Sequence, residues 1–229
     1  MASRVDHARA ETPGAAKSPN ARGELTERSR DRILAAALSE FANRGFDGTT
    51  TAEIARRAGV TQPLVHYHFD SKDALWYATV EEAFRTAAVS FADVGSELAD
   101  LDLVDQMKVL LRRYVRFSAT NPELARIVSY EGVQGGPRLQ WLSEHHLTNR
   151  FDWFGQLFEQ GVEAGRLKDL PTQHVMTSVS AAGAYLFIIR AAMQEVHGID
   201  VTDPVVVEAH ADTIVELFFH GLVRDEVAS

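Results

Sequence analysis

The stretch that decides the fold is TTAEIARRAGVTQPLVHYHFDSKDAL, residues 50–75. Thr50 and Glu53 form a capping box, in which each side chain can bond the other's free backbone N–H at the start of a helix. Gly59 supplies the left-handed residue that ends this short helix. Thr61 can cap a second short helix directly afterwards. Two short helices joined by a turn that contains glycine predict a helix-turn-helix.

Helices are also predicted on both sides of this pair. Apolar residues at helical spacing predict a helix over 27–44, with Thr26 as its N-cap and Gly45 as its stop. Ser71 is the expected cap of a long helix that follows. We therefore expect a three-helix DNA-binding head over residues 26–72. Residues 1–25 show no apolar period and are predicted to be a disordered arm.

The remainder of the chain, residues 73–229, has no alternating run of the kind that forms strands. Breaks rich in glycine and proline divide it into helical segments. We expect an all-α fold, with a helical effector-binding and dimerisation domain after the head. Its predicted helices lie near 102–119, 122–131, 138–164, 172–197 and 204–223.

Composition restricts the class of protein. The 229 residues carry a formal net charge of −9 and include no cysteine, which excludes disulfides and thiolate metal sites. The acidic excess lies beyond residue 73, so nucleic-acid binding would use one small face of the head. The N-terminus lacks the apolar core of a secretory signal, and the apolar run 175–189 is short for a membrane span. We expect a cytoplasmic protein that does not act at a membrane.

The second short helix has the composition of a recognition helix. Val65 and Phe69 are spaced to pack inward, which leaves the N-terminal end of the helix exposed. Gln62 can pair with adenine, and Pro63 or Leu64 can pack on a thymine methyl group. The predicted phosphate contacts are donors on and around this helix: Thr50, Thr51, Thr61, His66, Tyr67, His68 and Lys72.

The run from Gly45 to Leu75 resembles the DNA-binding domain of the TetR family of transcriptional regulators. The matching positions are Gly45, Thr49, Thr50, Ile54, Ala55, Ala58, Gly59, Val60, Thr61, Tyr67, Phe69 and Lys72. His66 and Ala52 depart from the family pattern, which more often has Tyr and a basic residue there. The resemblance implies a homodimeric repressor that binds a near-palindromic duplex operator and is released by a small effector.

The same resemblance implies that the last two helices join two protomers and that the middle helices hold the effector. The predicted dimer residues are small or apolar: Ser178, Ala182, Val207, Ala211, Ile214, Phe218 and Leu222. Ligand pockets are mostly apolar with a few orienting polar groups, so a largely apolar effector is expected. The candidate ligand residues are Met107, Tyr130, Glu131, Trp141, His145, Trp153 and Tyr185.

Other interpretations of the same residues stay open. His66 and His68 point to different sides of a helix and have no third ligand nearby, so no metal site is predicted. No nucleophile, phosphate loop or cofactor motif occurs, so neither an enzyme nor a cofactor is expected. The last two helices can instead be core helices of a monomer. The head can also be a protein-binding surface of a helical adaptor, and salt-sensitive, sequence-specific duplex binding separates the two functions.

Overall fold

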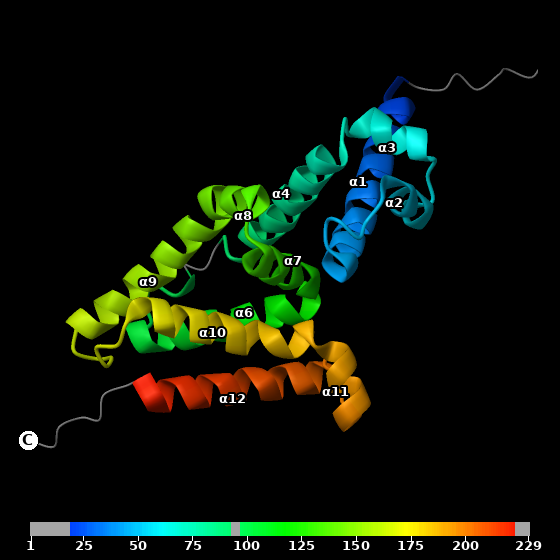
Figure 1. Cartoon of the computed structure of the whole chain (residues 1–229). Coiled ribbons are helices and arrows are strands. Elements are labelled where there is room, and N and C mark those ends of the chain that lie inside the picture. The colour runs from blue at the N-terminus through cyan, green and yellow to red at the C-terminus, as the bar shows by residue number, and fades with distance from the viewer. Residues whose placement is uncertain (1–18, 93–96, 223–229) are drawn as a thin grey trace, which may run out of the picture.

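The computed structural model describes residues 19–92 and 97–222, and over these ranges the chain contains helices and no strand (Figure 1). The predicted all-α fold is confirmed. The helices are α1 (Pro19–Arg44), α2 (Thr51–Ala58), α3 (Gln62–His68), α4 (Lys72–Ser90), α6 (Leu103–Thr120), α7 (Pro122–Gln134), α8 (Pro137–Leu142), α9 (Thr148–Glu163), α10 (Thr172–Ile188), α11 (Arg190–His197) and α12 (Pro204–Leu222), with a π-helical segment at Ser143–Leu147 between α8 and α9.

The head consists of α1, α2 and α3, packed around apolar residues of all three helices. Ile33, Ile54 and Val65 are completely buried at its centre. The predicted capping box is present: the Glu53 N–H donates to the Thr50 hydroxyl, and the Thr50 N–H donates to the Glu53 carboxylate. Gly59 follows α2 with φ 64°, a backbone conformation that glycine adopts without steric cost.

The N-terminal boundary of the head differs from the prediction. α1 begins at Pro19, so residues 19–25 are helical and Thr26 lies inside the helix instead of capping it. Proline is well suited to the first position of a helix, because its missing N–H has no intrahelical partner there. The absence of an apolar period in 19–25 does not prevent a helix from continuing over them. Residues 1–18 of the predicted arm lie outside the described residues.

Two predicted long helices are broken. The π-helical turn Ser143–Leu147 divides the predicted helix 138–164. The predicted helix 172–197 is divided into α10 and α11, and the axes of these two helices differ by 64°. A π turn inserts one residue and rotates the side chains that follow it. Neither break contains glycine or proline, so the sequence gives no signal for either.

The body is built on α6, which packs along α12 and α10. α6 and α12 are linked by ion pairs from Arg112 to Asp212 and from Arg116 to Glu208. The order of these pairs shows that the two helices run antiparallel. No described helix has by itself the length and hydropathy to cross a bilayer, and α10 with α11 meets those criteria only as a sharply bent pair.

The core of the head continues into the body without a gap. Leu75 and Phe84 of α4, Ile127 of α7 and Leu142 of α8 belong to the same buried cluster as the head residues. In Figure 1, α4 and α7 lie between the head and the layer formed by α6, α10 and α12. A displacement of α4 or α7 would therefore be transmitted directly to the head.

Candidate nucleic-acid interface and ligand cavity

α3 exposes polar side chains around a buried anchor. Val65 is completely buried, and Phe69 just beyond the helix is 6% exposed. The predicted contact residues Thr61, Gln62, Pro63, His66 and Tyr67 are all exposed, and Leu64 is half-buried. Such a helix can present side chains to a groove while its inner face fixes it to the head.

The N-terminal ends of α2 and α3 are joined by a side-chain hydrogen bond. Gln62 Nε2 donates to Thr51 Oγ1 over 3.2 Å, which places both residues on one exposed surface. The Thr50 hydroxyl at the start of α2 is engaged in the capping box. Thr61 occupies the N-cap position of α3 but makes no side-chain cap hydrogen bond, contrary to our prediction. Its hydroxyl can therefore serve an external partner.

Two of the residues predicted to contact phosphates form hydrogen bonds within the chain. Lys72 Nζ donates to the carbonyl oxygens of Phe46 and Thr49, over 3.0 and 3.1 Å. His68 Nε2 lies 3.0 Å from Ser29 Oγ, and burial together with the nearby Arg30 lowers the pKa of His68. Both side chains connect neighbouring segments of the head, so a phosphate contact from either would be made beside these internal bonds, and it stays a prediction. The sequence gives no signal for these internal hydrogen bonds, because the bonded residues are distant in the chain.

The head also places an unpaired cation beside the helix-turn-helix. Among the described residues, Arg32 makes no ion pair, and a Cβ at Gly59 would lie 4.0 Å from its guanidinium. Arg57, in contrast, is paired with the buried Glu40 over 3.0 Å, and Arg44 is paired with Glu53. Arg32 is thus a basic group near the α2–α3 turn that sequence reasoning missed.

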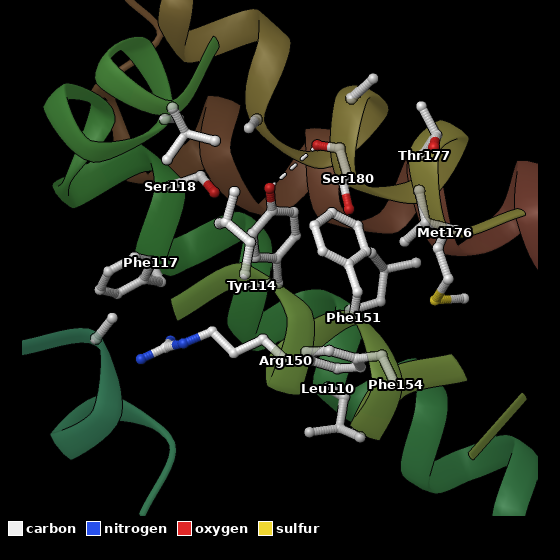
Figure 2. A pocket seen from close by; sticks show the side chains of 18 of the residues that line it. Leu110, Tyr114, Phe117, Ser118, Arg150, Phe151, Phe154, Met176, Thr177 and Ser180 are labelled. Atoms are coloured by element: carbon white, nitrogen blue, oxygen red, sulfur yellow. Dashed lines mark hydrogen bonds between the residues drawn. The ribbon is translucent and has the colours of Figure 1, made fainter. Parts of the chain in front are cut away.

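A cavity of about 610 Å³ lies in the body, between α4, α6, α7, α9, α10 and α12 (Figure 2). Its wall is mainly aliphatic and aromatic, as binding pockets for small molecules usually are. Three of the predicted ligand residues, Met107, Trp153 and Tyr185, line it. Lining residues that sequence reasoning missed include Tyr114, Phe117, Ser118, Arg150, Phe151, Met176 and Ser180.

The other four predicted ligand residues do not line this cavity. Tyr130 packs on Gly45, and Glu131 is 1% exposed and bound by Arg138 over 3.1 and 3.2 Å. The Trp141 ring packs on Trp76 and Tyr77, and the ring of His145 stacks on Trp141. These residues occupy the faces of α7, α8 and the π turn that point toward the head and α4.

Polar groups in the cavity wall are few. The Tyr114 hydroxyl donates to the Ser180 carbonyl oxygen over 3.1 Å (Figure 2). Burial raises the pKa of Tyr114, which keeps the phenol protonated as a donor. Arg150, at the start of α9, is half-buried and donates from Nη2 to the Phe84 carbonyl oxygen over 3.2 Å. Burial lowers the pKa of Arg150, because the charged guanidinium is partly removed from water.

The predicted dimer stripe on α12 is largely internal. Val207, Ala211, Ile214 and Leu222 are buried in the core of the body, and Phe218 lines the cavity. The apolar stripe of α12 therefore covers α6 of its own chain, which leaves these five residues little surface for a partner. Ser178 is exposed and Ala182 is half-buried on α10, so these two remain candidates.

α10 and α12 adjoin, and each has an exposed large apolar side chain. His210 Nε2 of α12 lies 3.0 Å from the Ala182 carbonyl oxygen, which shows that the two helices are in contact. Leu217 of α12 is 66% exposed and Tyr185 of α10 is 58% exposed. Among the described residues, no three acidic, histidine or cysteine side chains gather as a metal site.

Comparison with known proteins finds two family models on this chain. Residues 33–79 match "Bacterial regulatory proteins, tetR family", and residues 104–218 match "Tetracyclin repressor-like, C-terminal domain". The transcriptional regulator RutR of Escherichia coli K12 is 25% identical over 211 residues, which cover 92% of this chain and 98% of RutR.

Solved structures share the fold. The ketosteroid transcriptional regulator KstR2 of Mycobacterium tuberculosis superimposes with a TM-score of 0.69 at 16% identity, over 86% of this chain and 95% of KstR2. AibR, in complex with isovaleryl coenzyme A and operator DNA, gives a TM-score of 0.67 at 18% identity, over 84% and 98% of the two chains.

Proposed function

The chain belongs to the TetR family of transcriptional regulators, and from this premise we propose that it is a homodimeric repressor. It binds a near-palindromic duplex operator and leaves it when a small molecule enters the cavity of the body. The observation that carries the proposal is the exposed N-terminal end of α3, where Gln62 is held by Thr51 above a buried Val65.

The residues that contact the DNA bases lie in the first turn of α3. Gln62 can bond the major-groove edge of adenine, and Pro63 with Leu64 can contact a thymine methyl group. Phosphate contacts come from exposed donors around that turn. They are Thr51, Thr61, His66, Tyr67 and Arg32, whereas Thr50, Lys72 and His68 also hold hydrogen bonds within the head.

Effector control follows from the position of the cavity. Leu124 and Val128 of α7 line it, whereas Ile127 and Tyr130 of the same helix pack against the head. Phe84 of α4 also belongs to both the cavity wall and the core of the head. A ligand that changes the position of α7 or α4 therefore changes the orientation of the head.

The dimer interface that we propose lies on the exposed sides of α10 and α12. It includes Ser178 and Ala182 of α10 and Leu217 of α12, whose side chains are exposed or half-buried in the single chain. A two-fold axis through this surface gives two recognition helices, which reach successive major grooves about 34–36 Å apart. A regulator of this kind acts on chromosomal DNA, so we place it in the cytoplasm.

Selection from a random duplex library at moderate salt tests the proposal, with sequencing of the enriched pool. We expect a near-palindrome whose half-sites are about one helical turn apart. The matched control is Gln62→Ala, which should lose preference at one position in each half-site. A folded protein that enriches no sequence, with or without a ligand, would contradict the proposal and favour the helical adaptor.

A further inference from the structure

Within the described residues, Arg150 is the only charged side chain in the wall of the cavity. Figure 2 shows it extending from α9 among the lining side chains, with its guanidinium on the side of Phe117 and α4. Its Cζ lies 4.9 Å from the centroid of the Phe84 ring, and its one hydrogen bond to protein goes to the Phe84 carbonyl oxygen. The other guanidinium N–H groups are left for a partner.

No carboxylate in the described part of the chain pairs with Arg150. Other arginines of the body do have acidic partners: Arg112, Arg113 and Arg116 bind Asp212, Glu97 and Glu208. The acidic residue on α4 near this end of the cavity, Glu81, is directed to His146 instead, with 3.1 Å between Oε2 and Nε2. A half-buried cation without a counter-charge is unfavourable, and an anion bound in the cavity would remove that cost.

Polar side chains accompany Arg150 in the wall, together with the aromatic Phe84 and Phe117. Arg150 is joined by Ser118, Asn121 and Asn149, where α6 ends and α9 begins. The opposite end is formed by the start of α6 and the end of the antiparallel α12. The lining residues from these two helix segments are apolar: Met107, Leu110, Leu111, Phe219 and Leu222.

We propose that the cavity binds an amphipathic monoanion, whose carboxylate lies on Arg150 and whose apolar body extends toward the opposite end. This deepens the proposed function, because it names the chemical class of the effector. A guanidinium presents parallel N–H groups that match the two oxygens of a carboxylate. A single arginine in an otherwise uncharged wall suits one negative charge better than the multiple charges of a phosphate ester.

Isothermal titration of the full-length protein, without DNA, tests this proposal. The probes are octanoate, decanoate and dodecanoate, each compared with the alcohol of the same chain length. We expect at least one acid to bind about 10- to 100-fold more tightly than its alcohol, as for other hydrogen bonds to a charged group. Equal affinity of acid and alcohol, or binding of neither, would overturn the proposal.

Variants of Arg150 test whether this residue causes the tighter binding of the acid. Arg150→Met should retain the affinity for the alcohol and lose the preference for the acid, whereas Arg150→Lys should keep part of that preference. The matched control Arg166→Met removes a cation that is exposed outside the cavity, and it should bind like the wild type. If Arg150→Met fails to fold, Arg150→Lys and the acid–alcohol comparison in the wild type still test whether Arg150 binds the carboxylate. An unchanged preference in Arg150→Met would overturn the assignment.

Failure of this proposal is distinguishable from failure of the regulator assignment. A protein that selects a palindrome but binds acid and alcohol alike is a regulator with a different effector. A protein that binds the acid through Arg150 but selects no DNA contradicts the proposed function and leaves the ligand class standing.

Discussion

The ring of Tyr130 in α7 lies directly over Gly45, the residue that ends α1. A Cβ added to Gly45 would be 2.5 Å from Cζ of that ring, and Gly45 itself has φ 68°. Arg126 of α7 donates to Asn43 over 3.0 Å in the same region. The head and the body therefore meet through close packing at this point, which leaves no room for a larger residue.

Gly45→Ala should destabilise the protein for two reasons that can be separated. The left-handed backbone alone costs about 1–2 kcal/mol with an alanine, and the contact with Tyr130 adds to it. Gly59→Ala is the matched control, because its φ is 64° and the added Cβ meets only the end of Arg32 at 4.0 Å. Urea unfolding should show a larger loss for Gly45→Ala, and Tyr130→Ala should remove the excess. Equal losses for the two glycines would contradict a tight contact.

Lys72→Met should lower stability without changing the salt dependence of DNA binding. The variant loses two hydrogen bonds from a charged donor to the Phe46 and Thr49 carbonyl oxygens, and we expect a loss of about 1.5–3 kcal/mol. Operator titrations at several salt concentrations provide the second measurement. Arg32→Met is the comparison, and it should reduce the slope of log K against log salt by about 0.9. A reduced slope for Lys72→Met would restore Lys72 as a phosphate contact.

Gln62→Ala should relax base preference at one position of each half-site, at a cost of about 1–3 kcal/mol for the preferred sequence. Thr51→Val removes the acceptor that holds the Gln62 amide over 3.2 Å. We expect it to weaken the same preference to a smaller degree, because the amide loses its orientation but not its bonding capacity. The measurement is competition between operators that differ at single positions. Loss of preference at different positions in the two variants would argue against this coupling.

His210 should make stability dependent on pH. Burial lowers the pKa of His210 in the folded protein, partly offset by its contact with the Ala182 carbonyl oxygen. The unfolded chain therefore binds the proton more readily, so the contribution of His210 is complete above about pH 6.5 and is lost as the pH falls below it. Burial lowers the pKa of His68 and His146 as well, in the same direction.

The test is urea unfolding at about pH 8 and about pH 5.5, on either side of the ordinary histidine pKa. His210→Gln keeps a donor for the carbonyl oxygen but cannot be protonated, so it should lose less stability than the wild type on acidification. His174→Gln, at an exposed position on α10, removes a histidine without touching this contact. A wild-type pH dependence in His210→Gln would assign the effect to the other histidines.

Local signals in the sequence predicted the helix-turn-helix within the head. The capping box at Thr50, the glycine at position 59 and the inward spacing of Val65 and Phe69 act between near neighbours, and the structure has each of them. The exposure of Thr61, Gln62 and Tyr67 follows from the same helical period. These features depend on backbone geometry over a few residues, which the sequence determines by itself.

Tertiary structure alone decided where the partners of the other side chains lie. Lys72 was expected to face a phosphate but binds carbonyl groups more than twenty residues away. The stripe on α12 would be apolar in a dimer interface and is equally apolar in the core of a single chain. Only the packing of the folded chain shows that it covers α6. The phase of α9 depends on the π turn before it, so the direction of Arg150 into the cavity was not readable from periodicity. Such contacts arise between segments that are distant in the chain, and their selection depends on the packing of the whole molecule.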